Sequence, residues 1–203
     1  MKPTGAPLTV AWLIVLFVTT RQQRSAGRRE SRRLQHNHST NLRRLRNEPS
    51  RVLVTSLLWL DDRRWWPYVP VFATIVAPAE RRLHWWRWLL VGFAAHTIGT
   101  YVGQSYLGVS IRRGKAPRRL VDARDVGVSY FVLGLAGTLS GYLRRPWRFR
   151  CQAAAVGALA GNVALRPTFT EVGHLTAFFV GLAATGLAPD RDAFAYPAPP
   201  VRR

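Results

Sequence analysis

The sequence predicts an all-α polytopic membrane protein, a bundle of six helical spans with a long basic first loop. Three observations predict this fold. The 203-residue chain is 48% hydrophobic, yet it carries a formal net charge of +20. The charge is not spread over amphipathic faces but lies in blocks between long apolar runs, which is the pattern of membrane spans and their loops. Tryptophans gather where two of the runs begin, as a membrane interface favours.

The positive charge is almost entirely arginine, since Lys2 and Lys115 are the only lysines. A soluble protein this basic commonly binds nucleic acid. Because the charge here alternates with apolar runs, we do not expect a nucleic-acid partner and instead expect the arginine-rich loops to contact anionic lipid of the bilayer. The single cysteine, Cys151, excludes an internal disulfide and a cysteine-based zinc site. We expect neither a cofactor nor a metal.

The first apolar run, residues 6–20, is short, because a span needs about 20 residues, although tilt or bilayer thinning can absorb the difference. Lys2 before this run also fits a signal peptide. No small-residue cleavage site follows, so we interpret the run as a first span or an uncleaved anchor. Residues 21–51 hold ten arginines and are predicted to form the long first loop. Residues 52–60 are too short to span and fit a surface helix or a segment that enters the bundle.

The later spans follow from apolar runs that open on aromatic residues or lie between basic turns. Trp65 and Trp66 open the second run, and Trp85 and Trp86 open the third. The six predicted spans are about 6–20, 65–79, 85–111, 126–143, 149–165 and 168–188. Together they make residues 1–188 one transmembrane domain. The tail, residues 189–203, is predicted to be disordered.

Two glycine pairs stand out in the fourth and fifth spans. Gly137 and Gly141 are four residues apart, as are Gly157 and Gly161. That spacing places both glycines of a pair on one helix face, where a neighbouring backbone can approach closely. We therefore expect a compact bundle.

Ionisable groups inside a span are costly unless paired or hydrated, so they are candidates for function. The candidate residues are His96, Asp125, Glu171 and His174, with Ser129 beside them. Ser129 follows Asp125 by four residues and His174 follows Glu171 by three, so each pair shares a helix face. The fourth and sixth spans run in the same direction, which puts both faces near the same membrane surface. This favours a Ser–His dyad, in which the imidazole takes the hydroxyl proton and Ser129 attacks a carbonyl.

Other interpretations of these residues stay open. Asp125 fits an N-cap of the fourth span, and Thr168 with Glu171 fits a capping box. His174 could pack against another helix through a hydrogen bond, and we interpret His96, deeper in its span, as a structural hydrogen-bonding group. Glu171 and His174 also have a spacing that metal ligands use in helical bundles, so an intramembrane metal or proton site is a third possibility.

Several segments between residues 39 and 187 carry a family resemblance. They are Trp59-Leu60-Asp61, Ala77-Pro78-Ala79-Glu80-Arg81, the span around His96, Asp125-Val126-Gly127-Val128-Ser129-Tyr130 and Gly173-His174-Leu175. In these segments the chain resembles the rhomboid family, and most closely the rhomboid-like membrane proteins of actinobacteria.

The resemblance implies a fold, an activity and a site. Rhomboids are six-helix intramembrane serine proteases without a cofactor. Their nucleophile lies in a Gly-x-Ser-Gly motif on helix four and their base is a histidine on helix six. By resemblance, Gly127-x-Ser129 supplies the nucleophile motif and part of the oxyanion hole, and His174 with Ala177 and Gly181 supplies the second motif. The implied location is the cell membrane, as a multi-pass protein, and the implied partner is a transmembrane protein substrate or client.

The sequence departs from the family motif in two places. Tyr130 stands where the motif has a glycine. The His-x-x-x-Asn of helix two, which helps to bind the oxyanion, would lie near Arg64 and Tyr68, where neither a histidine nor an asparagine occurs. Losing one oxyanion donor costs about 10²–10³ in rate. Two functions therefore stay open: an intramembrane serine protease, and a catalytically inactive rhomboid-like pseudoprotease that binds membrane proteins.

Overall fold

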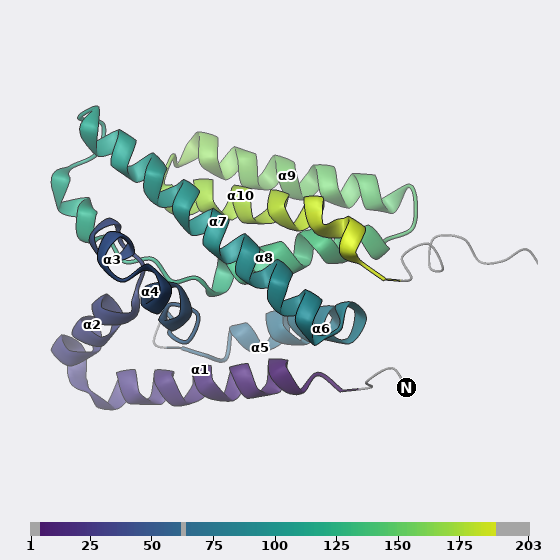
Figure 1. Cartoon of the computed structure of the whole chain (residues 1–203), viewed down its shortest axis with the longest axis horizontal. Coiled ribbons are helices and arrows are strands. Elements are labelled where there is room, and N and C mark those ends of the chain that lie inside the picture. The colour runs from purple at the N-terminus through teal and green to yellow at the C-terminus, as the bar shows by residue number, and fades with distance from the viewer. Residues whose placement is uncertain (1–4, 62–63, 190–203) are drawn as a thin grey trace, which may run out of the picture.

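The computed structural model describes residues 5–61 and 64–189, and within them the chain is helical without a β-strand (Figure 1). The order of elements is α1 (Pro7–Ser25), α2 (Gly27–His38), α3 (Leu42–Asn47), α4 (Pro49–Thr55), α5 (Tyr68–Val71), η1 (Phe72–Val76), α6 (Ala77–Leu83), α7 (Trp85–Arg112), η2 (Arg118–Asp122), α8 (Val128–Leu139), η3 (Ser140–Tyr142), α9 (Trp147–Leu165), α10 (Phe169–Ala183) and η4 (Ala184–Leu187). The predicted helical bundle is thus present.

The centre of the bundle is formed by α7, α8 and α10, which pack against one another more extensively than any other helices described. Glycines make this packing close. A Cβ added at Gly181 of α10 would lie 2.0 Å from the carbonyl oxygen of Gly134 on α8, and one added at Gly134 would lie 2.2 Å from the Cβ of Ala95 on α7. Since no side chain fits between these backbones, the three helices are held at short distances. The two helices that bear Ser129 and His174 belong to this centre.

Helix α1 lies along another side of the bundle, where it contacts α2, α6 and η1 (Figure 1). Trp12 anchors it. The indole ring packs on Phe72, Trp88 and Phe131, with ring centroids 4.9, 6.0 and 4.9 Å away, and the indole N–H donates to the carbonyl of Leu57 at 2.8 Å. An aromatic cluster with its polar atom satisfied is a strong packing element.

The N-terminus of α1 is held by a buried carboxylate from α6. Glu80 accepts hydrogen bonds from the backbone N–H of Leu8 at 2.9 Å and from the N–H and hydroxyl of Thr9 at 2.7 and 2.6 Å. These N–H groups have no acceptor within their own helix, and a negative charge is favourable at this end of a helix. Glu80 therefore caps α1 from a distant part of the chain.

Each of the six predicted spans coincides with helical structure, and the second span is the least regular. It forms one helical run, residues 68–83, in which the π-helix η1 separates α5 from α6. Thr74 donates its hydroxyl to the carbonyl of Pro70 at 2.7 Å, and Pro78 removes one backbone donor from the run. Within the described residues, no helix is both long enough and apolar enough to cross a membrane.

The prediction that residues 21–51 form a loop needs correction, because most of this segment is helical. Helix α1 continues to Ser25, and α2, α3 and the first three residues of α4 occupy most of the rest of the segment. Arginine, glutamine and leucine favour helix, and these short helices are fixed by tertiary contacts. Gln35 is one such contact, since its amide donates to the carbonyl of Asp61 at 2.7 Å. Of the two interpretations of residues 52–60, entry into the bundle is the one observed, because Leu57 and Leu60 are buried.

The prediction that the glycine pair of the fifth span packs against a neighbouring helix also needs correction. Helix α9 has no buried residue, and a Cβ added at Gly157 or Gly161 would meet nothing within 4 Å. Gly137, in contrast, packs as expected, because its Cβ would lie 2.6 Å from the carbonyl oxygen of Phe178. The predicted disordered tail lies, beyond Pro189, outside the described residues.

Candidate active site

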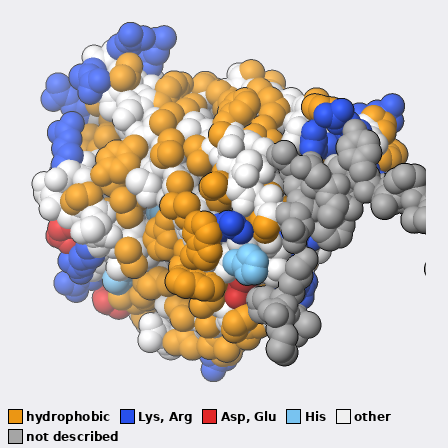
Figure 2. All heavy atoms as spheres, turned by 45° about the vertical axis from the view of Figure 1, so that its right-hand side comes forward, with side chains coloured by type: hydrophobic (Ala, Val, Ile, Leu, Met, Phe, Trp, Pro, Cys, Tyr) orange, Lys and Arg blue, Asp and Glu red, His pale blue; other side chains and the backbone are white. Residues whose placement is uncertain are grey.

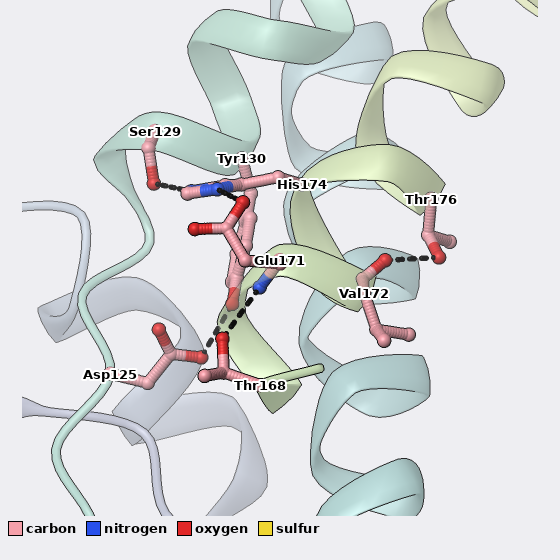
Figure 3. Close-up of polar contacts among 8 residues, drawn as sticks. All are labelled: Asp125, Ser129, Tyr130, Thr168, Glu171, Val172, His174 and Thr176. Atoms are coloured by element: carbon pink, nitrogen blue, oxygen red, sulfur yellow. Dashed lines mark hydrogen bonds and ion pairs between the residues drawn. The ribbon is translucent and has the colours of Figure 1, made fainter. Parts of the chain in front are cut away.

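Ser129 and His174 come together at one end of the central helices. Ser129 is in the first turn of α8, and His174 is in the second turn of α10. The Nε2 atom of His174 lies 2.9 Å from the Oγ atom of Ser129 (Figure 3). Both side chains are half-buried. This is the distance at which an imidazole can take a proton from a hydroxyl.

Glu171 lies on the other side of the histidine ring. Its Oε2 atom is 3.6 Å from Nδ1 of His174 (Figure 3). Thr168 caps α10, since its hydroxyl accepts a hydrogen bond from the N–H of Glu171 at 3.3 Å. The Thr168 half of the predicted capping box is therefore present. The Glu171 half is not, because the N–H of Thr168 donates to the carbonyl of Arg166 at 2.7 Å and the Glu171 carboxylate faces the imidazole. A carboxylate in this place favours the tautomer with a proton on Nδ1 and a lone pair on Nε2, toward Ser129.

A cavity of about 290 Å³ opens beside the pair. Its walls come from the start of α8, the start of α10, α5 and the two short segments that precede α5 and α8. The lining residues are Leu60, Asp61, Tyr68, Arg124, Asp125, Val126, Val128, Ser129, Thr170 and His174. A serine hydroxyl and an imidazole that share a cavity of this size can both reach one bound group.

The interpretation of Asp125 as the cap of the fourth span needs correction. Helix α8 begins at Val128 with Gly127 at the cap position, and no side chain caps it. Asp125 precedes the helix, where its carbonyl accepts a hydrogen bond from the N–H of Thr40 at 2.9 Å. Its carboxylate instead accepts a hydrogen bond from the hydroxyl of Tyr130 at 2.9 Å (Figure 3). Burial raises the pKa of Asp125 to about 7, and the nearby charge of Asp61 also raises it.

Tyr130 occupies space that two glycines provide. A Cβ added at Gly173 of α10 would lie 2.7 Å from the Tyr130 hydroxyl, and one at Gly99 of α7 would lie 3.6 Å from its ring. The fully buried ring stands edge-on to His174, with 5.2 Å between the ring centroids. The Tyr130 ring therefore fits between α7 and α10 where these glycines carry no side chain. Sequence reasoning missed the roles of Gly99 and Gly173, although their small size was visible in the sequence.

His96 lies outside the Ser129–His174 pair and serves packing. Its Nε2 atom is 3.0 Å from the carbonyl oxygen of Leu53 and 3.3 Å from the hydroxyl of Ser56. The ring also accounts for the glycine at position 127, because a Cβ at that position would lie only 1.9 Å from the His96 ring. His96 thus joins α7 to the α4 segment.

Of the two predicted backbone oxyanion donors, one is already hydrogen-bonded within the fold and the other is at the start of a helix. The N–H of Gly127 donates to the carbonyl of Ser56 at 3.2 Å, so it is already used in the fold and does not serve as a free donor. The N–H of Ser129 lies in the first turn of α8, where backbone donors have no acceptor within the helix. Of the two helix-two positions, Tyr68 lines the cavity and Arg64 is exposed.

In the part of the chain that the structure describes, no group of three or more histidine, cysteine, aspartate or glutamate side chains is arranged to hold a metal ion. The metal alternative therefore lacks a ligand set among these residues. Glu171 and His174 face each other instead, beside Ser129. The arrangement suits proton transfer.

The model of the family described as "Rhomboid-like protein" matches residues 4–193, nearly the whole chain. The chain belongs to the rhomboid-like family. No curated protein and no solved structure shows a significant match. In this rhomboid-like protein, Ser129 and His174 are in direct contact.

Proposed function

We propose that this rhomboid-like protein is a multi-pass membrane protein that cleaves peptide bonds of membrane-embedded substrates. Ser129 is the nucleophile and His174 is the general base. The observation that carries the proposal is the 2.9 Å contact between Ser129 Oγ and His174 Nε2, beside a cavity that can hold a peptide segment.

The distribution of surface residues supports the membrane location. Figure 2 shows hydrophobic side chains over a broad middle part of the visible face, while lysines and arginines gather toward its two ends. Large apolar side chains are exposed on several helices, among them Ile14 of α1, Leu90 of α7 and Leu165 of α9, which are 56%, 51% and 82% exposed. An apolar belt of this kind between charged ends suits lipid better than water.

The proposed reaction is acyl transfer. Ser129 Oγ attacks the peptide carbonyl carbon while His174 Nε2 takes the hydroxyl proton, which gives a tetrahedral oxyanion. The imidazolium then gives this proton to the leaving amine, and the carbon–nitrogen bond breaks to leave an acyl-Ser129 ester. Water, deprotonated by His174, hydrolyses the ester and restores the hydroxyl. Glu171 stabilises the imidazolium that forms twice in this cycle, because its carboxylate faces Nδ1.

The oxyanion requires donors, and the family's helix-two pair is absent. We propose the N–H of Ser129 and the hydroxyl of Tyr68 for this role. Tyr68 lies at the start of α5 and lines the cavity together with Ser129 and His174. Removing its hydroxyl with Tyr68→Phe is expected to lower the cleavage rate by about 10²-fold.

A fluorophosphonate probe, which reacts with activated serines, tests the proposal. We expect the wild type in detergent micelles to be labelled, and Ser129→Ala and His174→Ala to be unlabelled. Ser50→Ala, which removes an exposed serine of α4, is the matched control and should label as the wild type does. The absence of both labelling and cleavage of model transmembrane substrates by folded wild-type protein would contradict a protease.

One observation favours a second function, that of a pseudoprotease which binds membrane proteins without cleaving them. The N–H of Gly127 is occupied by Ser56, so the proposed oxyanion hole has fewer backbone donors than the motif implies. This function predicts that photo-crosslinking captures the same membrane proteins with the wild type and with Ser129→Ala. A protease should instead hold its substrates longer when Ser129 is replaced.

A further inference from the structure

We propose that a groove between α3, η2 and the C-terminal end of α7 binds the phosphate of an anionic phospholipid, with Arg46 and Arg112 as its main ligands. The inference rests on the membrane location proposed above but not on proteolysis. The groove is formed by different helices from those around the Ser129–His174 cavity. No residue lines both the groove and that cavity.

The groove consists of two adjoining cavities of about 400 and 270 Å³. They share Leu42 and Arg46 of α3 with Gly108 and Arg112 of α7. Gly108, which has no side chain, lines both cavities. An added Cβ there would lie 3.6 Å from an Nη atom of Arg112 and 3.7 Å from a methyl group of Leu42. Gly108 thus forms the floor, with an arginine and a leucine directly over it.

The charge of the groove is strongly positive. Arg43, Arg46 and Arg112 line it, and Asn47 adds an amide. Arg43 forms an ion pair with Asp122 at 3.4 Å. Among the residues described, neither Arg46 nor Arg112 has an acidic partner. Two unneutralised guanidinium groups at one hollow are a favourable setting for a phosphate, which they can bind through several N–H donors.

The groove is apolar on one side, which separates a lipid from a free phosphate ion. Beyond the arginines, the smaller cavity is lined by the apolar residues Tyr101, Leu45 and Val109 and by the polar residues Gln104 and Ser105. Tyr101 and the neighbouring Val102 are large apolar residues that are 42% and 39% exposed. A headgroup phosphate at the arginines would therefore lead directly to a hydrophobic surface of α7 on which an acyl chain can lie.

The position in the fold is also suitable. Figure 1 shows α3 beside the end of α7 that is far from α6. Tryptophans mark the opposite end of α7, at Trp85 and Trp86. If α7 crosses the bilayer as proposed, both of its ends lie at headgroup depth, where phosphates and arginines meet.

Native mass spectrometry of the full chain, released from detergent with a phosphatidylglycerol or a phosphatidylcholine of the same acyl chains, tests this site. We expect one phosphatidylglycerol to bind more tightly than phosphatidylcholine. The double variant Arg46→Gln/Arg112→Gln should weaken phosphatidylglycerol binding by roughly thirtyfold. Gly108→Leu, which fills the hollow and keeps every charge, should also weaken it.

The matched control is Arg148→Gln/Arg150→Gln, which removes the same charge from the start of α9, where both arginines contact aromatic rings. It should bind phosphatidylglycerol as the wild type does. An equal loss in the control, or unchanged binding by Arg46→Gln/Arg112→Gln, would overturn the proposal. Displacement of the lipid by millimolar inorganic phosphate would also overturn it in favour of a free phosphate site. Ser129→Ala should retain lipid binding, so a failure of the protease proposal is distinguishable.

Discussion

The glycines of the bundle centre and those of α9 look alike in the sequence but have opposite surroundings. In the centre, a Cβ at Gly181 would lie 2.0 Å from the backbone of Gly134. In α9, Gly157 and Gly161 have open space around the position of the missing Cβ. The comparison teaches that a four-residue glycine spacing states only that a close approach is possible. Whether a neighbour makes the approach depends on the packing of the other helices.

The comparison also separates two kinds of helix in this protein. Helices α7, α8 and α10 bury residues along their length, and α8 and α10 carry the Ser129–His174 pair. Helix α9 buries none and contacts the bundle mainly through α10 and η3. Substitutions in the centre should therefore disturb both stability and the site, whereas substitutions in α9 should disturb neither.

The largest effect is expected from Gly181→Ala. The added methyl group would collide with the carbonyl of Gly134, which is backbone and cannot move as a side chain can. Overpacking of this kind should lower the free energy of unfolding by about 3 kcal/mol or more. Unfolding in mixed micelles, followed by tryptophan fluorescence, measures the loss. A wild-type stability for Gly181→Ala would show that α8 and α10 are not in such close contact.

An intermediate effect is expected from the polar contact inside the centre. Tyr130→Phe removes the hydroxyl that donates to Asp125 and leaves a buried carboxyl without this partner. The expected cost is about 2 kcal/mol in the free energy of unfolding. Asp125→Ala, which removes the acceptor, measured alone and in the Tyr130→Phe background, closes a double-mutant cycle. Additive losses in that cycle would contradict a direct interaction between the two side chains.

The pH dependence of stability offers a related test. Because the pKa of Asp125 is raised to about 7 by burial, the folded protein binds a proton that the unfolded chain has released. The wild type should therefore become more stable as the pH falls from about 8 to about 5, relative to Asp125→Asn. Unfolding curves of both proteins at the two pH values measure the difference. The same pH dependence in both would show that Asp125 is not the group that takes up the proton.

The smallest effect is expected from Gly157→Ala in α9. Nothing lies within 4 Å of the added Cβ, so no contact is lost. Alanine favours helix over glycine by up to about 1 kcal/mol, so the variant should be slightly more stable than the wild type. Measured beside Gly181→Ala, it gives the contrast between the two regions directly. A loss of stability at Gly157 would mean that another surface covers this face of α9.

Much of the fold could be predicted because hydrophobic runs and their boundaries reflect helices directly. Each predicted span has a helical counterpart. The third agrees best, since the predicted span is 85–111 and α7 covers Trp85–Arg112. The first loop could not be predicted as helical. Residues 21–51 are polar, and their helices depend on contacts such as Gln35 with Asp61, which joins residues 26 positions apart.

The candidate site shows the same division. The Ser129–His174 juxtaposition follows from helix periodicity and direction, which a sequence contains. For Asp125 the sequence leaves two roles open, a functional carboxylate and a helix cap, because Asp before an apolar run often caps. The structure starts α8 two residues later than that role requires, and the side chain turns to Tyr130. Such a choice between two local partners depends on where Thr40 fixes the backbone.

The fit of Tyr130 against Gly173 has a consequence for which residues these two positions can hold. Glycine at position 130 alone would leave a void the size of the tyrosine side chain and would remove the hydrogen-bond donor of the buried Asp125. A larger residue at position 173 would collide with the tyrosine, because its Cβ would lie 2.7 Å from the Tyr130 hydroxyl. Positions 130 and 173 can therefore be changed only together.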